Sequence, residues 1–320
     1  MSQVEAEQKI LLESGTNEVE ILEFFLGGQS YGINVSKILQ IITYDEEFLT
    51  ETPESPVAMP GVLLWREKTI PFIDLYKALN IDVRQNVERP IVLVTEFNGL
   101  VCCFLIDGVN RIHRISWDRI DSMNSYLDQF SSRFTGSVHV DEKDVLLVDF
   151  EFLVAELFPE TKLGYGSAIE IPHDVTPETR GQMHIVLAED SPFIRHAIID
   201  LLKQAGYSQV AEFENGQIAL QHLMGLKGKA QDENRPLGEL VSLVISDIEM
   251  PQLDGLTLCR KLKNDPPYSR TPVVIFSSLI NEQMIDKCND VGADAHITKP
   301  QMGMLVQTLD HLLFGAEPPK

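Results

Sequence analysis

The spacing of apolar residues changes near the middle of the chain and divides it in two. Up to residue 158, short apolar runs rich in β-branched and aromatic residues are separated by Gly, Pro, Asn and Asp, which predicts a succession of short strands. From residue 183 onwards, strand-like runs alternate with amphipathic segments of helical length. Residues 159–182 hold three prolines and three glycines but few large apolar side chains, which is typical of a linker. We therefore predict a β-rich domain over 18–158 and an α/β domain over 183–315.

The α/β domain repeats a strand followed by a helix five times. Its strand-like runs are, in order, HIVLAED, VAEF, LVISD, PVVIFSS and AHITKP. This alternation predicts a flavodoxin-like, doubly wound sheet of five parallel strands with helices on both faces. In such a sheet the groups that do chemistry gather at the edge where the strands end. Residues 225–239 are more than a compact connection from helix to strand needs, and we expect a loop there.

The β-rich domain contains an internal repeat, because Gly61–Asp74 and Gly136–Asp149 span the same interval. Within these two segments, Lys68 matches Lys143, Ile70 matches Val145 and Asp74 matches Asp149. Upstream of them, Gly28, Val35, Ile38 and Ile41 match Gly99, Ile106, Val109 and Ile112, respectively. Two related β subdomains, each too small to be stable alone, are therefore expected to pack side by side. Since Asp74 and Asp149 are equivalent in the repeat, we interpret them as turn acids and not as catalysts.

Composition and charge narrow the class of protein. The 320 residues are 44% hydrophobic, enough for two cores, and the formal net charge of -22 argues against a nucleic acid or an anionic membrane as the partner. The first residues lack the basic and apolar regions of a signal peptide, and no apolar run is long enough to span a membrane, so we expect a cytoplasmic protein without membrane insertion. The scattered histidines argue against a zinc or haem site. Four cysteines without paired spacing are interpreted as reduced core residues: Cys102, Cys103, Cys259 and Cys288.

Five polar residues follow strands of the α/β domain: Glu189 and Asp190 after the first, Asp247 after the third, Ser277 after the fourth and Lys299 after the fifth. Each alone has an ordinary explanation as a helix cap, a turn residue or a solvated cation. Together they place three carboxylates, a hydroxyl and an ammonium group at one edge, and like charges that close are costly unless a cation lies among them. Mg2+ prefers such oxygen ligands. The set predicts a magnesium-dependent phosphoryl-transfer site with Asp247 as its nucleophile.

The order Glu-Asp, Asp-x-x-Met-Pro-x-x-Asp-Gly, Ser, Lys-Pro resembles the receiver domain of two-component response regulators over residues 183–315. The resemblance implies that Asp247 accepts phosphate from a kinase phosphohistidine. It also implies that Glu189 and Asp190 help to hold Mg2+, with the backbone carbonyl of Glu249 as a further ligand.

The same resemblance assigns the remaining polar residues of this edge. Ser277 matches the hydroxyl that follows the phosphoryl group inward, and Lys299 matches the lysine that contacts it. The aromatic switch position, three residues before that lysine, is His296 in this chain. Histidine is bulky enough to change rotamer with the phosphorylation state, and unlike Tyr or Phe it also titrates near neutral pH.

The first domain resembles the CheW-like coupling proteins of bacterial chemotaxis over residues 18–158. The similar stretches are ILEFFLGGQSYGINVSKILQII and MPGVLLWREKTIPFIDL. The resemblance implies a pair of small five-stranded β barrels and a role for Arg66 in binding chemoreceptors. Without it, Arg66 would be interpreted as an ordinary exposed hairpin cation. Glu67 replaces the glycine usual at that position, and the preceding Leu-Trp also departs from the common pattern.

A CheW-like domain followed by a receiver is the arrangement of the CheV family. The resemblance implies a cytoplasmic, non-enzymatic adaptor that couples chemoreceptors to the histidine kinase CheA in receptor arrays on the inner face of the membrane. The receiver would catalyse only its own phosphoryl transfer and dephosphorylation. Phosphorylation could serve adaptation or could drain phosphate from the kinase, and the sequence does not choose between these uses.

Two other classes of protein share some of these features. A phosphatase of the haloacid dehalogenase class also uses an aspartate, a hydroxyl, a lysine and magnesium, but its nucleophile lies on the first strand, whereas Asp247 follows the third. A DNA-binding response regulator would need a basic helix-turn-helix segment, and none is expected here because the chain ends at Lys320, soon after the last predicted helix.

Overall fold

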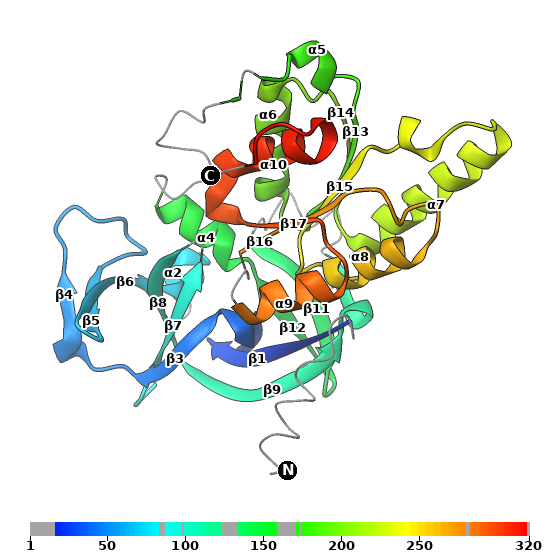
Figure 1. The fold of residues 1–320 in the computed structure, drawn as a ribbon. Coiled ribbons are helices and arrows are strands. Elements are labelled where there is room, and N and C mark those ends of the chain that lie inside the picture. Colours follow the sequence, from blue (N-terminus) through cyan, green and yellow to red (C-terminus); the bar gives the residue numbers. More distant parts are fainter. Residues whose placement is uncertain are drawn as a thin grey trace, which may run out of the picture. The chain divides into compact units, whose positions relative to one another are not determined.

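The computed structural model divides into two compact units, one formed by Val19–Ile115 with Arg119–Ala168 and the other mainly by Ile169–Lys320 (Figure 1). The structure describes residues 17–82, 87–97, 99–122, 133–158, 171–172, 174–278 and 282–318. Most of the expected linker, 159–170 and 173, lies outside the described residues.

The first unit consists of two six-stranded sheets. One has the strand order β9-β1-β2-β12-β11-β10, and the other has the order β3-β7-β8-β6-β5-β4. The strands are β1 (Glu18–Leu26), β2 (Gln29–Asn34), β3 (Ile38–Thr43), β4 (Leu49–Glu51), β5 (Gly61–Trp65), β6 (Lys68–Asp74), β7 (Ile91–Phe97), β8 (Leu100–Ile106), β9 (Gly108–Ser116), β10 (Ile120–Ser122), β11 (Phe134–Val140) and β12 (Lys143–Val148). Its helices are the short α2 (Leu75–Ala78) and α4 (Phe150–Leu157).

The internal repeat is confirmed, but its two halves exchange strands. The hairpin β1–β2 joins the sheet of the second half, where Gly32 lies opposite Leu147 in a parallel pair. The hairpin β7–β8 joins the sheet of the first half, where Cys103 lies opposite Phe72 in the equivalent parallel pair. Each sheet therefore contains strands of both repeats. Each also has one strand more than the five expected, and the three-residue strands β4 and β10 form equivalent edges.

Equivalent tight turns join β5 to β6 and β11 to β12. Each turn passes through two consecutive residues with positive φ, Arg66 (46°) and Glu67 (65°) in the first and Asp141 (49°) and Glu142 (63°) in the second. Two consecutive residues with positive φ are typical of the type I′ turn, whose twist suits a hairpin with a two-residue loop. The turn makes Arg66 the tip of a hairpin, as the sequence predicts.

Helix α4 joins the two sheets in one core. Asp149 caps this helix by accepting a hydrogen bond from the backbone N–H of Phe152 at 2.8 Å, which confirms its interpretation as a turn acid. The ring of Phe150 lies 6.2 Å from Phe24 of one sheet and 4.8 Å from Phe104 of the other. One aromatic side chain thus contacts both sheets.

A buried carboxylate ties together four strands of the first sheet. Glu23 on β1 is fully buried and accepts hydrogen bonds from Ser30 (2.8 Å) and Asn110 (2.9 Å). It also contacts His113 Nε2 at 2.8 Å and forms an ion pair with Lys143. Burial alone would raise the pKa of Glu23, but these hydrogen bonds together outweigh it and lower that pKa to about 2.

The second unit is a receiver-like α/β sandwich. Its five strands are all parallel in the order β14-β13-β15-β16-β17, which is the flavodoxin-like order and confirms the prediction. The strands are β13 (His184–Ala188), β14 (Gln209–Phe213), β15 (Leu243–Ser246), β16 (Val273–Ser277) and β17 (Ala295–Thr298). The helices are α5 (Pro177–Arg180), α6 (Pro192–Ala205), α7 (Gly216–Asp232), α8 (Gly255–Asn264), α9 (Glu282–Asp290) and α10 (Met302–Phe314).

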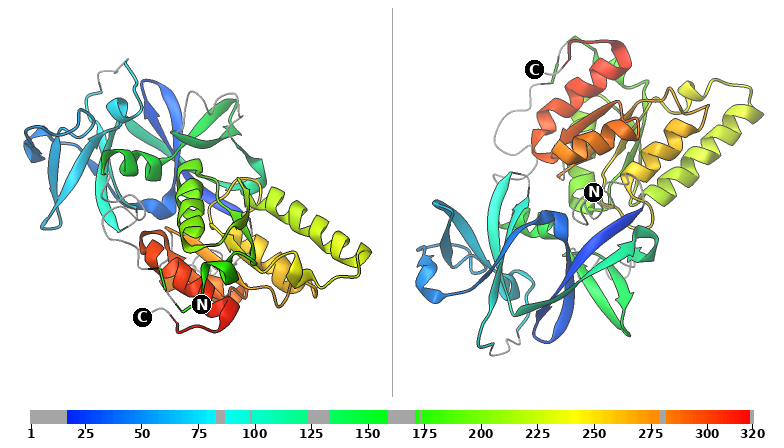
Figure 2. Two further views of the ribbon diagram at one scale, coloured as in Figure 1. Left: turned by 90° about the horizontal axis from the view of Figure 1, so that it is seen from above. Right: turned by 60° about the horizontal axis from the view of Figure 1, so that its bottom comes forward.

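The helices of this unit cover both faces of its sheet. Helices α6 and α10 contact each other on one face, and α7, α8 and α9 share a core on the other, as Figure 2 shows from two further directions. The expectation of a loop over 225–239 is wrong for its first half, because α7 continues to Asp232. The residues from Gly225 to Asp232 include good helix formers such as Leu, Lys, Ala and Gln, which offset its two glycines.

The last part of the predicted linker folds against the receiver unit. Arg180 of α5 is only 1% exposed and binds Asp310 of α10 with two hydrogen bonds of 2.9 and 2.6 Å. Tyr207 donates a third hydrogen bond to Asp310 at 2.7 Å, and Arg180 also donates to the carbonyl of Ala205 at the end of α6. The full extent of the linker stays a prediction, but its residues 176–182 pack as part of this unit.

All four cysteines are buried and free, as predicted, and burial raises the pKa of the Cys102 thiol to about 12. In the part of the chain that the structure describes, no helix is both long enough and apolar enough to cross a membrane.

Candidate functional site

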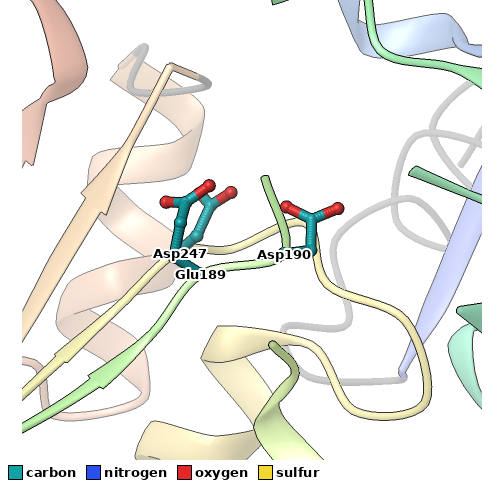
Figure 3. Close-up of side chains that lie close together, drawn as sticks. All are labelled: Glu189, Asp190 and Asp247. Carbon is teal, nitrogen blue, oxygen red and sulfur yellow. The ribbon is translucent and has the colours of Figure 1, made fainter. Parts of the chain in front are cut away.

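The three acids predicted for the sheet edge lie together in the structure. Strands β13 and β15 are parallel neighbours with Ala188 opposite Ser246, so the residues that follow each strand meet at one edge. Carboxylate oxygens of Glu189, Asp190 and Asp247 lie within 4.8 Å of one another. Figure 3 shows the carboxylates of Glu189 and Asp247 side by side, with Asp190 next to them. Glu189 and Asp247 are buried, whereas Asp190 is half-buried.

Lys299 reaches this group of acids from the end of β17. Its side chain is 2% exposed, and its Nζ lies 3.1 Å from Glu189 Oε1 and 3.0 Å from Asp247 Oδ2. The other oxygen of Asp247 accepts a hydrogen bond from the backbone N–H of Ile248 at 2.6 Å. Three carboxylates thus face one ammonium group, which leaves an excess of negative charge. Closely spaced hard oxygen ligands with such an excess fit Mg2+.

A glycine allows the chain to pack tightly behind Asp247. A Cβ atom on Gly255 would lie 1.8 Å from the carbonyl oxygen of Asp247, so no other residue fits without moving that backbone. Gly255 also donates its N–H to the carbonyl of Ile248 at 3.0 Å. Asp254 caps α8 by accepting hydrogen bonds from the N–H and the hydroxyl of Thr257, at 2.8 and 2.7 Å. The Asp-Gly pair of the motif therefore fixes the turn that carries the acid.

The remaining residues predicted for this site lie on β16 and β17 or shortly after β15. Ser277 is fully buried at the end of β16, opposite Thr298, which precedes Lys299. His296 is half-buried on β17 opposite Ile275. Glu249 is half-buried two residues after Asp247. Their positions agree with the expected roles, which stay predictions.

Arg66, the residue predicted to bind receptors, lies in the other unit. Its guanidinium group stacks over the ring of Trp65, 4.5 Å from the ring centroid, and its Nη2 lies 3.4 Å from Gln40 Oε1. Trp65 Nε1 donates to the same oxygen of Gln40 at 2.9 Å. The cation is exposed but supported by neighbouring side chains.

Arg195 also contacts the receiver site, although it is not among the residues predicted from the sequence. Its Nη1 donates to the carbonyl oxygens of Glu189 and Asp190, at 2.7 and 3.3 Å. One signal was available, because Arg195 lies in the first turn of the helix that follows the acid pair, close to the turn that carries it.

Comparison with known proteins assigns each half of the chain to a domain family. The CheW-like domain family matches residues 20–158, and the response regulator receiver domain family matches residues 185–310. Together they define a chemotaxis adaptor that carries its own receiver domain. The chain is 30% identical over 295 residues to the chemotaxis protein CheV3 of Helicobacter pylori, an alignment that covers 88% of this chain and 91% of that protein. It is 26% identical over 304 residues to CheV1 of the same organism, covering 88% of this chain and 89% of the relative. The chain therefore belongs to the CheV family of chemotaxis proteins.

Proposed function

We propose that this chain links chemoreceptors to the histidine kinase CheA through its CheW-like domain and accepts phosphate from that kinase on Asp247. The observation that carries the second part is the position of Asp247, at the end of a buried strand and bound to Lys299. A buried strand holds the nucleophile in a fixed position, and phosphoryl transfer requires the reacting atoms to be held in a defined geometry.

The transfer consists of one displacement at phosphorus. An oxygen of Asp247 bonds to phosphorus while the bond from phosphorus to the kinase imidazole nitrogen breaks, and the imidazole leaves with the electron pair and takes up a proton. Lys299, whose Nζ lies 3.0 Å from Asp247 Oδ2, would offset the negative charge that the acceptor and the phosphoryl group bring together. Glu189, Asp190, Asp247 and the carbonyl of Glu249 would hold Mg2+, which when bound neutralises charge on the phosphoryl oxygens.

Phosphorylation changes the charge at a site that is already crowded. It adds about -1.5 to -2 charges and three acceptor oxygens beside Lys299, whose present partners are Glu189 and Asp247. Ser277 and Lys299 then rearrange around the new oxygens, His296 follows on β17, and the surface formed by α9 and β17 changes. Such a change would adjust coupling during adaptation, or the receiver would drain phosphate from the kinase. Both uses rest on the same acceptor.

The coupling half of the proposal rests on the match of residues 20–158 to the CheW-like family. Arg66, at the tip of the β5–β6 hairpin and supported by Trp65, is the residue proposed to contact chemoreceptors. Through such contacts the protein would reside in the cytoplasm at receptor arrays, as an adaptor without an enzymatic activity of its own beyond the receiver's phosphoryl chemistry.

Transfer of label from phosphorylated CheA in the presence of Mg2+ tests the acceptor. Wild-type protein and the control Asp200→Asn, which changes an exposed acid of α6, are expected to become labelled. Asp247→Asn is expected to remain unlabelled because an amide cannot form the acyl phosphate. Labelling of Asp247→Asn at the wild-type rate would refute the assignment.

Reconstitution with receptors and kinase tests coupling. Intact protein and Arg114→Ala, which removes an exposed cation from β9, are expected to join receptor-kinase complexes, whereas Arg66→Ala is expected to join them more weakly. Failure of the intact protein to join would contradict the coupling proposal. Equal binding by Arg66→Ala and Arg114→Ala would contradict only the role of Arg66.

A further inference from the structure

Arg195 connects three parts of the receiver unit near the acid pair. It lies on α6, is only 14% exposed, and donates Nη1 hydrogen bonds to the carbonyl oxygens of Glu189 (2.7 Å) and Asp190 (3.3 Å). Its Nε donates to Glu212 Oε2 on β14 at 3.1 Å. The guanidinium group therefore bridges the turn that carries the acids to the neighbouring strand.

The start of α6 directs this side chain towards the turn. Ser191 caps the helix, Pro192 occupies its first position, and the N–H of Arg195 donates to the carbonyl of Ser191 at 2.9 Å. Long side chains on a helix point back towards its N-terminus, so a residue in the first turn returns over the preceding loop.

The acid turn is thereby held at two points. The backbone N–H of Glu189 donates to the carbonyl of Phe213 at the end of β14, at 3.0 Å. The carbonyl side of the turn is bound by Arg195, which is itself fixed to Glu212 on the same strand. Arginine suits this position because its planar group offers several donors in a fixed geometry, whereas lysine provides a single point of charge.

We propose that Arg195 is a positioning residue for the metal site of the receiver: it fixes the backbone of Glu189 and Asp190 so that their carboxylates converge with Asp247. This inference rests on the proposed function, because it concerns the same site. Arg195 binds the main chain of the acids and acts through their carboxylates. In metal sites, residues that orient ligands in this way typically change metal affinity by about tenfold to a hundredfold when they are replaced.

Positioning and simple electrostatics predict opposite effects on Mg2+ binding. A positive charge beside the site repels a cation, so if charge alone mattered, Arg195→Gln would bind Mg2+ more tightly and Arg195→Lys would bind it like the wild type. If Arg195 positions the ligands, both variants bind Mg2+ more weakly, because neither keeps the bridge. Glu212→Gln changes a side chain that is 48% exposed and leaves the bonds to the carbonyls in place, so it weakens binding by a smaller factor.

The experiment is a calorimetric titration of the full-length protein with Mg2+ alone. Arg195→Gln and Arg195→Lys are expected to raise the dissociation constant by about tenfold or more. The control Lys203→Gln removes an exposed cation of the same helix and is expected to match the wild type. Thermal unfolding of each variant shows that the titration is made on folded protein. Unchanged or tighter binding by Arg195→Gln would overturn the proposal.

The rate of phosphoryl transfer from CheA gives a second readout. Because Arg195 acts on the metal ligands, labelling of Arg195→Gln is expected to be slow at low Mg2+ and to approach the wild-type rate at saturating Mg2+. A rate that stays low at saturation would overturn the role as a metal-positioning residue. If wild-type protein neither binds Mg2+ nor takes up label, the proposed function itself fails. If the wild type does both and the Arg195 variants match it, only this inference fails.

Discussion

Replacement of Asp310 by asparagine tests the anchor between α5 and α10. The substitution keeps the volume of the side chain but removes the negative charge that accepts hydrogen bonds from Arg180 and Tyr207. Arg180 and Asp310 are each only 1% exposed, so the arginine charge is left buried without its counter-charge.

The expected loss of stability is large. Removing one partner of a buried ion pair typically costs about 3–5 kcal/mol, because the remaining charge stays desolvated. For a unit of this size each kcal/mol lowers the melting temperature by about 2–4 °C, so the receiver transition should fall by roughly 6–20 °C. The double substitution Arg180→Met with Asp310→Leu removes both charges and should restore much of that loss.

Differential scanning calorimetry of the full-length protein measures this effect. The receiver transition is identified as the one that Mg2+ shifts upwards, since a ligand that binds the folded state stabilises it. If the free energy of unfolding of the receiver unit in Asp310→Asn lies within about 1 kcal/mol of the wild-type value, the reasoning is refuted. A surface ion pair contributes only about that much. A double variant less stable than Asp310→Asn alone would refute the account in terms of an unpaired charge.

Three further predictions concern single residues. Gly255→Ala should cost about 1–3 kcal/mol in urea unfolding and strongly reduce phosphate uptake, since its Cβ would meet the carbonyl of Asp247; wild-type labelling would contradict this. Lys299→Met should tighten Mg2+ binding in calorimetry, because Glu189 and Asp247 lose their ammonium partner, while phosphoryl transfer slows; weaker Mg2+ binding would contradict it. The pKa of Glu23 is lowered from 4.5 to about 2, so its stabilising effect is present above pH 4.5 and is lost as the pH falls towards 2. Urea unfolding of the β-rich unit should show this loss, and Glu23→Gln should reduce the pH dependence; an unchanged dependence would count against it.

The receiver could be predicted from the sequence almost element by element. In a parallel sheet every strand ends at the same edge, so a local pattern of strands is enough to bring Glu189, Asp190, Asp247 and Lys299 together. The extension of α7 was missed because glycines in its second half weaken the local helical signal.

Contacts between distant residues could not be predicted in this way. Arg180 lies in a stretch with the composition of a linker, and nothing near it in the sequence indicates a partner 130 residues away. The strand exchange was missed for the same reason. A strand's alternating pattern shows which face it buries but not which strand it pairs with, so the repeat predicted two related halves without their interleaving.

The exchange of strands between the two sheets also determines the order in which the domain can fold as it leaves the ribosome. All strands of the β3–β8 sheet are present once β8 has been made, whereas the amino-terminal hairpin β1–β2 waits for β12, because Tyr31 pairs with Leu146. During that interval the outer edge of β2 has no strand to pair with, and closing so long a loop is slow. The first hairpin to be synthesised is thus among the last parts of the domain to be completed.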